Sequence, residues 1–139
     1  AAPATFAQWI EGFYPEAAGD DAIVGPTADP DGDGMVNLLE YGLGRAPDVA
    51  EPPLAATLWP EPGSDNRYAA LTFDRAVGVA VVAEISDDLV AWSSAPAAIV
   101  QQGAAVPDAS GFHETVTFRS TAATSAKPRQ FLRVRVTAP

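Results

Sequence analysis

The chain has 139 residues, and 47% of them are hydrophobic, which is enough apolar material for one domain with its own core. It contains no cysteine, so disulfides and thiol chemistry are excluded. The formal net charge is −10, and residues 1–50 carry nine acidic side chains against a single arginine. This acidity repels nucleic-acid phosphates and anionic lipid surfaces, and no apolar run is long enough to span a membrane. We therefore expect neither nucleic-acid binding nor membrane insertion.

The first predicted element is a helix over residues 5–13. Thr5 and Gln8 have the spacing of a capping box, and Pro15 ends the helix. Its large apolar residues recur at i, i+3, i+4 and i+7, and so form one stripe: Phe6, Trp9, Ile10 and Phe13. Because the N-terminal part is too short to bury this stripe alone, the stripe needs partners further along the chain. The expected partners are one end of a β-rich part and four apolar residues: Val36, Leu39, Tyr41 and Leu43.

Residues 29–40 read D-P-D-G-D-G-M-V-N-L-L-E and match every specified position of the EF-hand type of calcium loop. Gly34 stands where the backbone must turn sharply. The predicted ligands are the carboxylates of Asp29, Asp31, Asp33 and Glu40, the backbone carbonyl of Met35, and Asn37 directly or through water. The alternative is an Asp/Gly-rich turn without a metal, but such a turn does not need Gly, Asn and Glu at these three further positions. The pattern therefore predicts bound Ca²⁺.

The segment before the loop departs from the helix–loop–helix plan of an ordinary EF-hand. Residues 14–28 contain two prolines and two glycines, so no helix is expected to run into the loop. On the exit side, Asn37 is placed to cap a short helix that ends at Gly44. Asp20 and Asp21 are interpreted as turn residues, with a second calcium contact as the alternative.

After the proline-rich stretch 47–53, the apolar pattern changes from the helical period to strict alternation. We therefore predict a helical calcium-binding part over residues 1–50 and a β-rich domain over residues 51–139. Alternating runs predict strands at 69–73, 79–85, 112–119 and 132–136, with shorter candidates at 56–59, 90–92 and 97–101. The predicted fold is mainly β, an antiparallel β-sandwich of the immunoglobulin or fibronectin type III kind. A small barrel is the alternative.

The sequence offers no recognisable catalytic constellation. His113 is the one histidine, and it is expected to face solvent on a strand while its neighbour Glu114 points to the opposite face. No serine lies in a nucleophile motif. A carboxylate pair assembled in space is the remaining route to an enzyme. We expect a protein that is not an enzyme.

Three aromatic residues are candidates for a sugar-binding platform. Trp59 lies next to Pro60 and a turn, where exposure is expected, and Tyr68 follows that turn. Trp92 is expected to fill the sandwich core. For each of the three, a structural role is the preferred interpretation.

Three stretches of the chain together resemble a known kind of module. The run D-P-D-G-D-G-M-V-N-L-L-E-Y-G-L-G-R-A-P follows F-A-Q-W-I and precedes I-S-D-D-L-V-A-W and F-L-R-V-R-V. This combination resembles the C-terminal modules of large secreted and surface proteins of environmental bacteria, with a calcium loop of the dockerin or thrombospondin type 3 kind. The resemblance implies a non-catalytic appendage. A dockerin has two such loops, and the single loop here argues against cohesin binding.

Two classes of function follow. The first is a calcium-stabilised structural or adhesive module, whose partners are copies of itself or a larger surface protein. The second is a carbohydrate-binding module of a secreted enzyme, with a polysaccharide as ligand. We expect a secreted or cell-surface location, because the start A-A-P-A-T is of the kind that signal peptidase leaves. A weak single calcium loop also fills only where Ca²⁺ is abundant.

Overall fold

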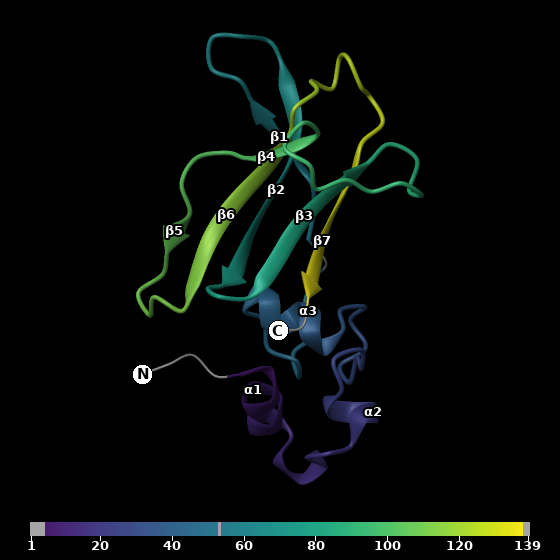
Figure 1. The fold of residues 1–139 in the computed structure, drawn as a ribbon, viewed down its shortest axis with the longest axis vertical. Helices are drawn as coiled ribbons and strands as arrows, with labels where there is room; N and C mark the ends of the chain where they lie inside the picture. Colours follow the sequence, from purple (N-terminus) through teal and green to yellow (C-terminus); the bar gives the residue numbers. More distant parts are fainter. Residues whose placement is uncertain (1–4, 53, 138–139) are drawn as a thin grey trace.

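The computed structural model describes residues 5–52 and 54–137; residues 1–4, with the small-residue start, and Pro53 lie outside the described residues. Two antiparallel sheets pack face to face, and the helices gather at one end of them (Figure 1). The predicted mainly β fold, a small antiparallel β-sandwich, is confirmed. None of the helices in the described part of the chain has the length and apolar character needed to cross a bilayer.

The larger sheet has the strand order β1-β2-β6-β4, and β5 also pairs with β6. Its strands are β1 (Thr57–Pro60), β2 (Arg67–Ala76), β4 (Ile99–Gln101), β5 (Val106–Pro107) and β6 (His113–Ser120). The smaller sheet consists of β3 (Ala80–Ser86) and β7 (Phe131–Thr137), paired so that Val81 lies opposite Val136. The strict alternation of apolar residues explains the pairing, since one face of each strand turns to the interior.

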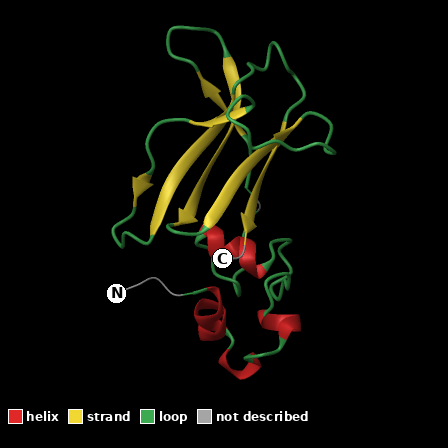
Figure 2. Cartoon of the chain, viewed as in Figure 1, coloured by secondary structure: helices red, strands yellow, loops and turns green. Residues whose placement is uncertain are grey.

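Helices occupy the N-terminal part of the chain (Figure 2): α1 (Phe6–Phe13), the 3-10 helix η1 (Pro15–Ala17), α2 (Asp21–Val24) and α3 (Asn37–Leu43). The predicted capping box of α1 is present, since Thr5 and Gln8 exchange hydrogen bonds between side chain and backbone. The rings of Phe6 and Trp9 pack on Tyr41 of α3 at centroid distances of 5.6 and 5.3 Å. The apolar stripe of α1 therefore meets the exit helix as expected, although Phe13 at its end stays exposed.

One hydrophobic core joins the helical part to the sheets. Met35 of the loop and Leu43 of α3 belong to the same buried cluster as six residues of the strands: Leu71, Phe73, Val81, Ala83, Ile99 and Val116. Burial of these side chains is the main stabilising contribution expected for such a small fold. The calcium-loop segment is thus a structural part of the sandwich core.

Three short segments of the fold have a secondary structure other than the one predicted. Asp20 caps the one-turn helix α2 by accepting the N–H of Ala22, so this acidic pair begins a helix where we expected only turns. Residues 90–92 form no strand, because the carboxylate of Asp88 accepts the N–H groups of Val90 and Ala91 and holds them in a bend. The short strand β5 was not predicted.

Candidate metal centre

Four carboxylates converge where the loop turns into α3. Asp29, Asp31, Asp33 and Glu40 each place one oxygen so that the four oxygens lie within 4.8 Å of one another. The first three side chains are partly exposed, whereas Glu40 is completely buried. The sequence prediction named these same four carboxylates. An all-oxygen set of this kind can hold a hard metal ion.

The backbone of the loop orients the three aspartates. Asp29 accepts the N–H groups of Gly32 and Gly34, at 3.1 and 3.0 Å. Asp31 accepts the N–H of Asp33 at 3.2 Å. Gly34 has φ +89°, a conformation that a side chain would penalise, which explains the predicted glycine at this turn. The loop therefore closes on itself with its carboxylates gathered on one side.

Glu40 is the most unusual residue of the cluster. Neither of its carboxylate oxygens has a hydrogen-bond partner within the described residues, and Oδ2 of Asp31 is buried without one as well. Burial, followed by the charges of Asp33, Asp31 and Asp29, raises the pKa of Glu40 from 4.5 to about 8. An unpaired buried carboxylate is costly, so the site requires either a proton or a cation to neutralise it.

The two neighbouring aspartates show opposite shifts. Burial raises the pKa of Asp31 above its usual value, and the carboxyl groups of Asp29 and Asp33 add to this, while the N–H of Asp33 acts in the opposite direction. Burial also acts to raise the pKa of Asp33, but the N–H groups of Met35 and Glu51 outweigh it and lower that pKa. Asp33 is thus held as a carboxylate by backbone donors, whereas Asp31 and Glu40 are the two groups whose negative charge is disfavoured until a proton or a cation neutralises it.

Asn37 takes a different position from the one predicted for it. Val36 is the N-cap of α3, and Asn37 is the first residue of the helix. Its buried amide nitrogen donates to the carbonyls of Ile23 and Gly25, at 2.8 and 3.0 Å, and so ties the end of α2 to the loop. This bonding, which no local pattern reveals, prevents the side chain from capping α3. Its Oδ1 is buried without a partner in the described residues, so it keeps the free oxygen that a metal ligand needs.

Met35 lies within the loop, and the acidic pair Asp20 and Asp21 lies before it. The side chain of Met35 is buried in the core, as expected of a residue that offers only its backbone carbonyl to the ion. Ligation by this carbonyl stays a prediction. Asp20 and Asp21 are not among the carboxylates that converge within the described residues.

Sequence reasoning missed one support of the site. The segment after α3 folds back on the loop, where Asp33 accepts the N–H of Glu51 at 3.2 Å. Arg45 pairs with Glu51 at 3.5 Å and donates to the carbonyl of Pro52 at 2.6 Å. The bond between Glu51 and Asp33 joins residues far apart in the chain, and the only hint of this support in the sequence was a lone arginine within an acidic segment.

The candidate aromatic platform is divided between the two sheets. Trp59 and Tyr68 lie opposite each other on β1 and β2, with ring centroids 6.0 Å apart, and Arg119 stacks on both. Trp92 lies outside the core and packs on Arg133 of β7, so its predicted place inside the sandwich is wrong. The reason is the Asp88 bend, which carries this segment away from the sheet interior.

His113 begins β6 and is half-buried. Its Nδ1 lies 3.9 Å from the carboxylate of Asp108, and its ring packs against Gly44. The prediction of a strand residue is correct, but the contact with Gly44 partly shields the ring from solvent. This histidine thus helps to pack the end of α3 against β6.

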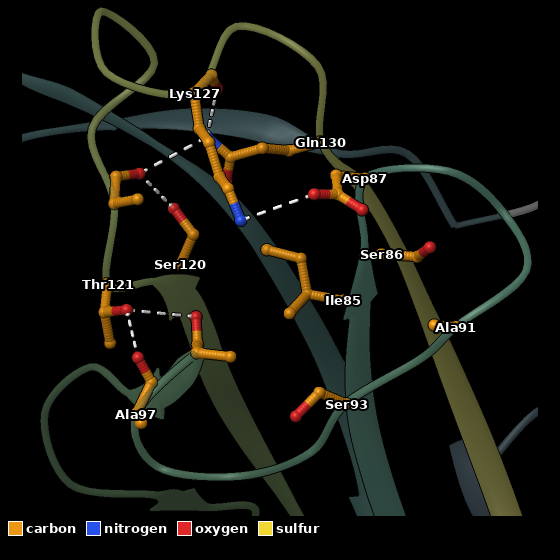
Figure 3. Close-up of a pocket in the computed structure, with 12 residues that line it drawn as sticks. Ile85, Ser86, Asp87, Ala91, Ser93, Ala97, Ser120, Thr121, Lys127 and Gln130 are labelled. Atoms are coloured by element: carbon orange, nitrogen blue, oxygen red, sulfur yellow. Dashed lines mark hydrogen bonds and ion pairs between the residues drawn. The ribbon is translucent and has the colours of Figure 1, made fainter.

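A pocket of about 310 Å³ is lined by the end of β3, the end of β6 and the loops that follow these strands (Figure 3). Lys127 reaches across it to Asp87 at 3.5 Å. The hydroxyls on its wall are used to hold loops: Ser120 donates to the carbonyl of Ala122, and Thr121 donates to that of Ala97. These two hydroxyl groups of the pocket wall therefore hold the neighbouring loops in place.

Comparisons with protein-family models, with curated proteins and with solved structures give no match. What the chain does must therefore be argued from its own geometry.

Proposed function

We propose that this chain is a non-catalytic module of an extracellular protein, stabilised by one Ca²⁺ ion and acting by holding onto other chains. The observation that carries the proposal is Glu40, a completely buried carboxylate with both oxygens unpartnered within the described residues and facing three aspartates. A bidentate glutamate at the end of the loop is what a calcium ion takes from this position. Smaller Mg²⁺ favours a stricter octahedral shell that retains water, and suits this loop less well.

The role proposed for calcium is structural. The loop sits between α2 and α3, and the residue that follows its acidic turn, Met35, belongs to the core shared with the sheets. An ion here fixes the helical part against the sandwich. Calcium sensors open a pair of helices when Ca²⁺ binds to their EF-hands. A single loop without an entering helix has no such pair to open, so we do not propose a calcium sensor.

Calorimetric titration with Ca²⁺ and Mg²⁺ tests the metal site. We expect one Ca²⁺ per chain, weaker Mg²⁺ binding and a large loss of Ca²⁺ affinity for Asp31→Ala. The matched control is Asp48→Asn, which removes an exposed charge from the same acidic half and should leave binding nearly unchanged. Equal Ca²⁺ affinity for the wild type and Asp31→Ala would contradict the assignment.

Thermal unfolding tests the structural role. Ligand linkage adds about 2.7 kcal/mol of stability at a hundredfold excess of free ligand over its dissociation constant. Chelation with EDTA should therefore lower the melting temperature clearly. A melting temperature that does not respond to chelation, together with exposure of a large apolar surface, would instead support a sensor.

A carbohydrate-binding module is the second candidate. The observation in its favour is the Trp59–Tyr68 pair with Arg119 on the outer face of the larger sheet. Aromatic rings on a flat sheet can stack on sugar rings. Retention on insoluble polysaccharides that Trp59→Ala abolishes would support this candidate over the first.

A further inference from the structure

The two sheets of the sandwich differ in width. The larger sheet extends to β1, whereas the smaller sheet ends at β7. Across the interface β3 contacts β4 and β7 contacts β2, so β1 lies beyond the free edge of β7. Leu58 of β1 is paired with the inward-facing Ala69, yet 61% of its surface is exposed. Within the part of the chain that the structure describes, no strand therefore covers this inward-facing leucine.

The free edge of β7 presents backbone groups that can accept another strand. Ile85 of β3 exchanges both of its backbone hydrogen bonds with Ser93, so its N–H and carbonyl point away from β7. Ile85 lies opposite Leu132, and hydrogen-bonding direction alternates along an antiparallel pair. The backbone groups of Leu132, Val134 and Val136 therefore point outward. Within residues 5–52 and 54–137, no backbone hydrogen bond uses them.

The side chains of β7 define what fits along this edge. Leu132, Val134 and Val136 are only half-buried on the inner face. On the outer face, Arg133 and Arg135 share a single carboxylate, that of Glu84, at 2.9 and 3.4 Å. Their side chains remain 46% and 52% exposed, so the edge carries excess positive charge on an otherwise acidic molecule.

We propose that β7 binds an extended acidic segment of a partner protein, which adds antiparallel to its free edge as a third strand of the smaller sheet. The segment alternates apolar residues with glutamate or aspartate: its apolar side chains cover Leu58, and its acidic side chains meet Arg133 and Arg135. Pairing of β7 with β7 of a second copy is disfavoured, because it brings arginines of like charge together. The inference names the partner class for the proposed module function, on which it rests.

The probe is a blocked, labelled peptide as long as β7 that alternates valine with glutamate, titrated against the full chain in Ca²⁺ and followed by fluorescence anisotropy. A peptide with lysine in place of glutamate should bind roughly tenfold more weakly. Similar binding of the glutamate and lysine peptides, or no binding of the glutamate peptide, would overturn the proposal.

Methylation of peptide nitrogens tests the hydrogen bonding directly. In antiparallel pairing, the peptide residues that exchange hydrogen bonds with Leu132 and Val134 lie directly opposite them, with side chains on the same inner face. In the bound peptide these residues are the valines. N-methylation of the valines should abolish binding, whereas N-methylation of the glutamates should preserve it. Equal binding of the two methylated peptides would exclude strand addition.

Variants of the chain test the same edge. Val134→Pro removes an outward N–H and leaves the ladder to β3 intact, so binding should be lost. Leu58→Asn should weaken peptide binding. Because this leucine is largely exposed, the substitution should have little effect on folding. The control is Leu89→Asn, which removes a leucine that is 58% exposed and lies in the loop after β3, outside the strands that form the site, and should have no effect. If Val134→Pro does not fold, the methylated peptides decide the matter.

The metal proposal can fail separately. A chain that binds Ca²⁺ normally but ignores the glutamate peptide refutes the strand site alone. A chain that binds the peptide equally with EDTA and shows no calorimetric Ca²⁺ binding refutes the calcium module and leaves the edge of β7 as a binding site.

Discussion

Val136 of β7 lies so close to Gly42 of α3 that a Cβ at position 42 would come within 2.5 Å of its Cγ2. The side chain of Val81, the cross-strand neighbour of Val136 on β3, lies 3.2 Å from the same point. The helix that carries Glu40 is therefore seated directly on the smaller sheet, and glycine is what permits this approach.

Gly42→Ala should reduce the stability of the fold. The added methyl group overpacks the contact, which costs about 1–3 kcal/mol. Gly12→Ala is the matched control, because nothing lies within 4 Å of a Cβ there and alanine favours the helix. Urea unfolding of the two variants should shift the midpoints in opposite directions. An unchanged midpoint for Gly42→Ala would mean that α3 is not packed as described.

Calcium binding should release a proton from Glu40. With a pKa of about 8, this carboxyl is mostly protonated at pH 7 in the metal-free protein, and a cation displaces the proton. Calorimetry at pH 7 in PIPES and in Tris should give binding enthalpies that differ by nearly one proton's heat of buffer ionisation. The difference should shrink at a pH well above the pKa. Identical enthalpies in the two buffers at pH 7 would contradict a protonated Glu40.

Stability of the metal-free protein should fall as the pH rises from 4.5 to 8, the usual and the folded pKa of Glu40. The folded state binds the proton more tightly than the unfolded chain, so this contribution is present in full at low pH and is lost above the folded pKa. Urea unfolding in EDTA measures it. Glu40→Gln should abolish this component, and saturating Ca²⁺ should cancel it, because the ion replaces the proton. A wild-type profile that matches Glu40→Gln would count against the shift.

Much of the site could be predicted because it is local in the sequence. The four carboxylates, Gly34 and the stop at Gly44 lie within one short segment, and each is required by ligand chemistry or by backbone conformation. The capping box of α1 is local for the same reason. The sandwich was predictable from alternation, since a face that is buried must be apolar at every second residue.

Other features depend on contacts between distant residues, and no pattern in the chain announces them. The bonds from Asn37 to Ile23 and Gly25 displace the predicted cap by one residue. Trp92 leaves the core because the Asp88 bend precedes it, although its segment reads as an apolar run. The unequal widths of the sheets follow from which strands pair, which is set by tertiary packing.

Asn37 should be the residue of the loop that tolerates substitution least. Asn37→Asp keeps the oxygen that faces the site but places a second oxygen against the carbonyls of Ile23 and Gly25, in a position without solvent. Losing two buried donor bonds and turning an acceptor toward two acceptors should cost about 3 kcal/mol of stability in EDTA.

The matched control is Asn66→Asp, where an exposed amide donates to Glu61 and the same exchange should cost less than about 1 kcal/mol. If Oδ1 of Asn37 ligates the ion, Ca²⁺ should restore part of the loss, because a carboxylate is also a good ligand. Urea unfolding of both variants, with EDTA and with Ca²⁺, measures the two effects. Equal losses for Asn37→Asp and Asn66→Asp would show that the bonds to α2 do not hold the loop in place.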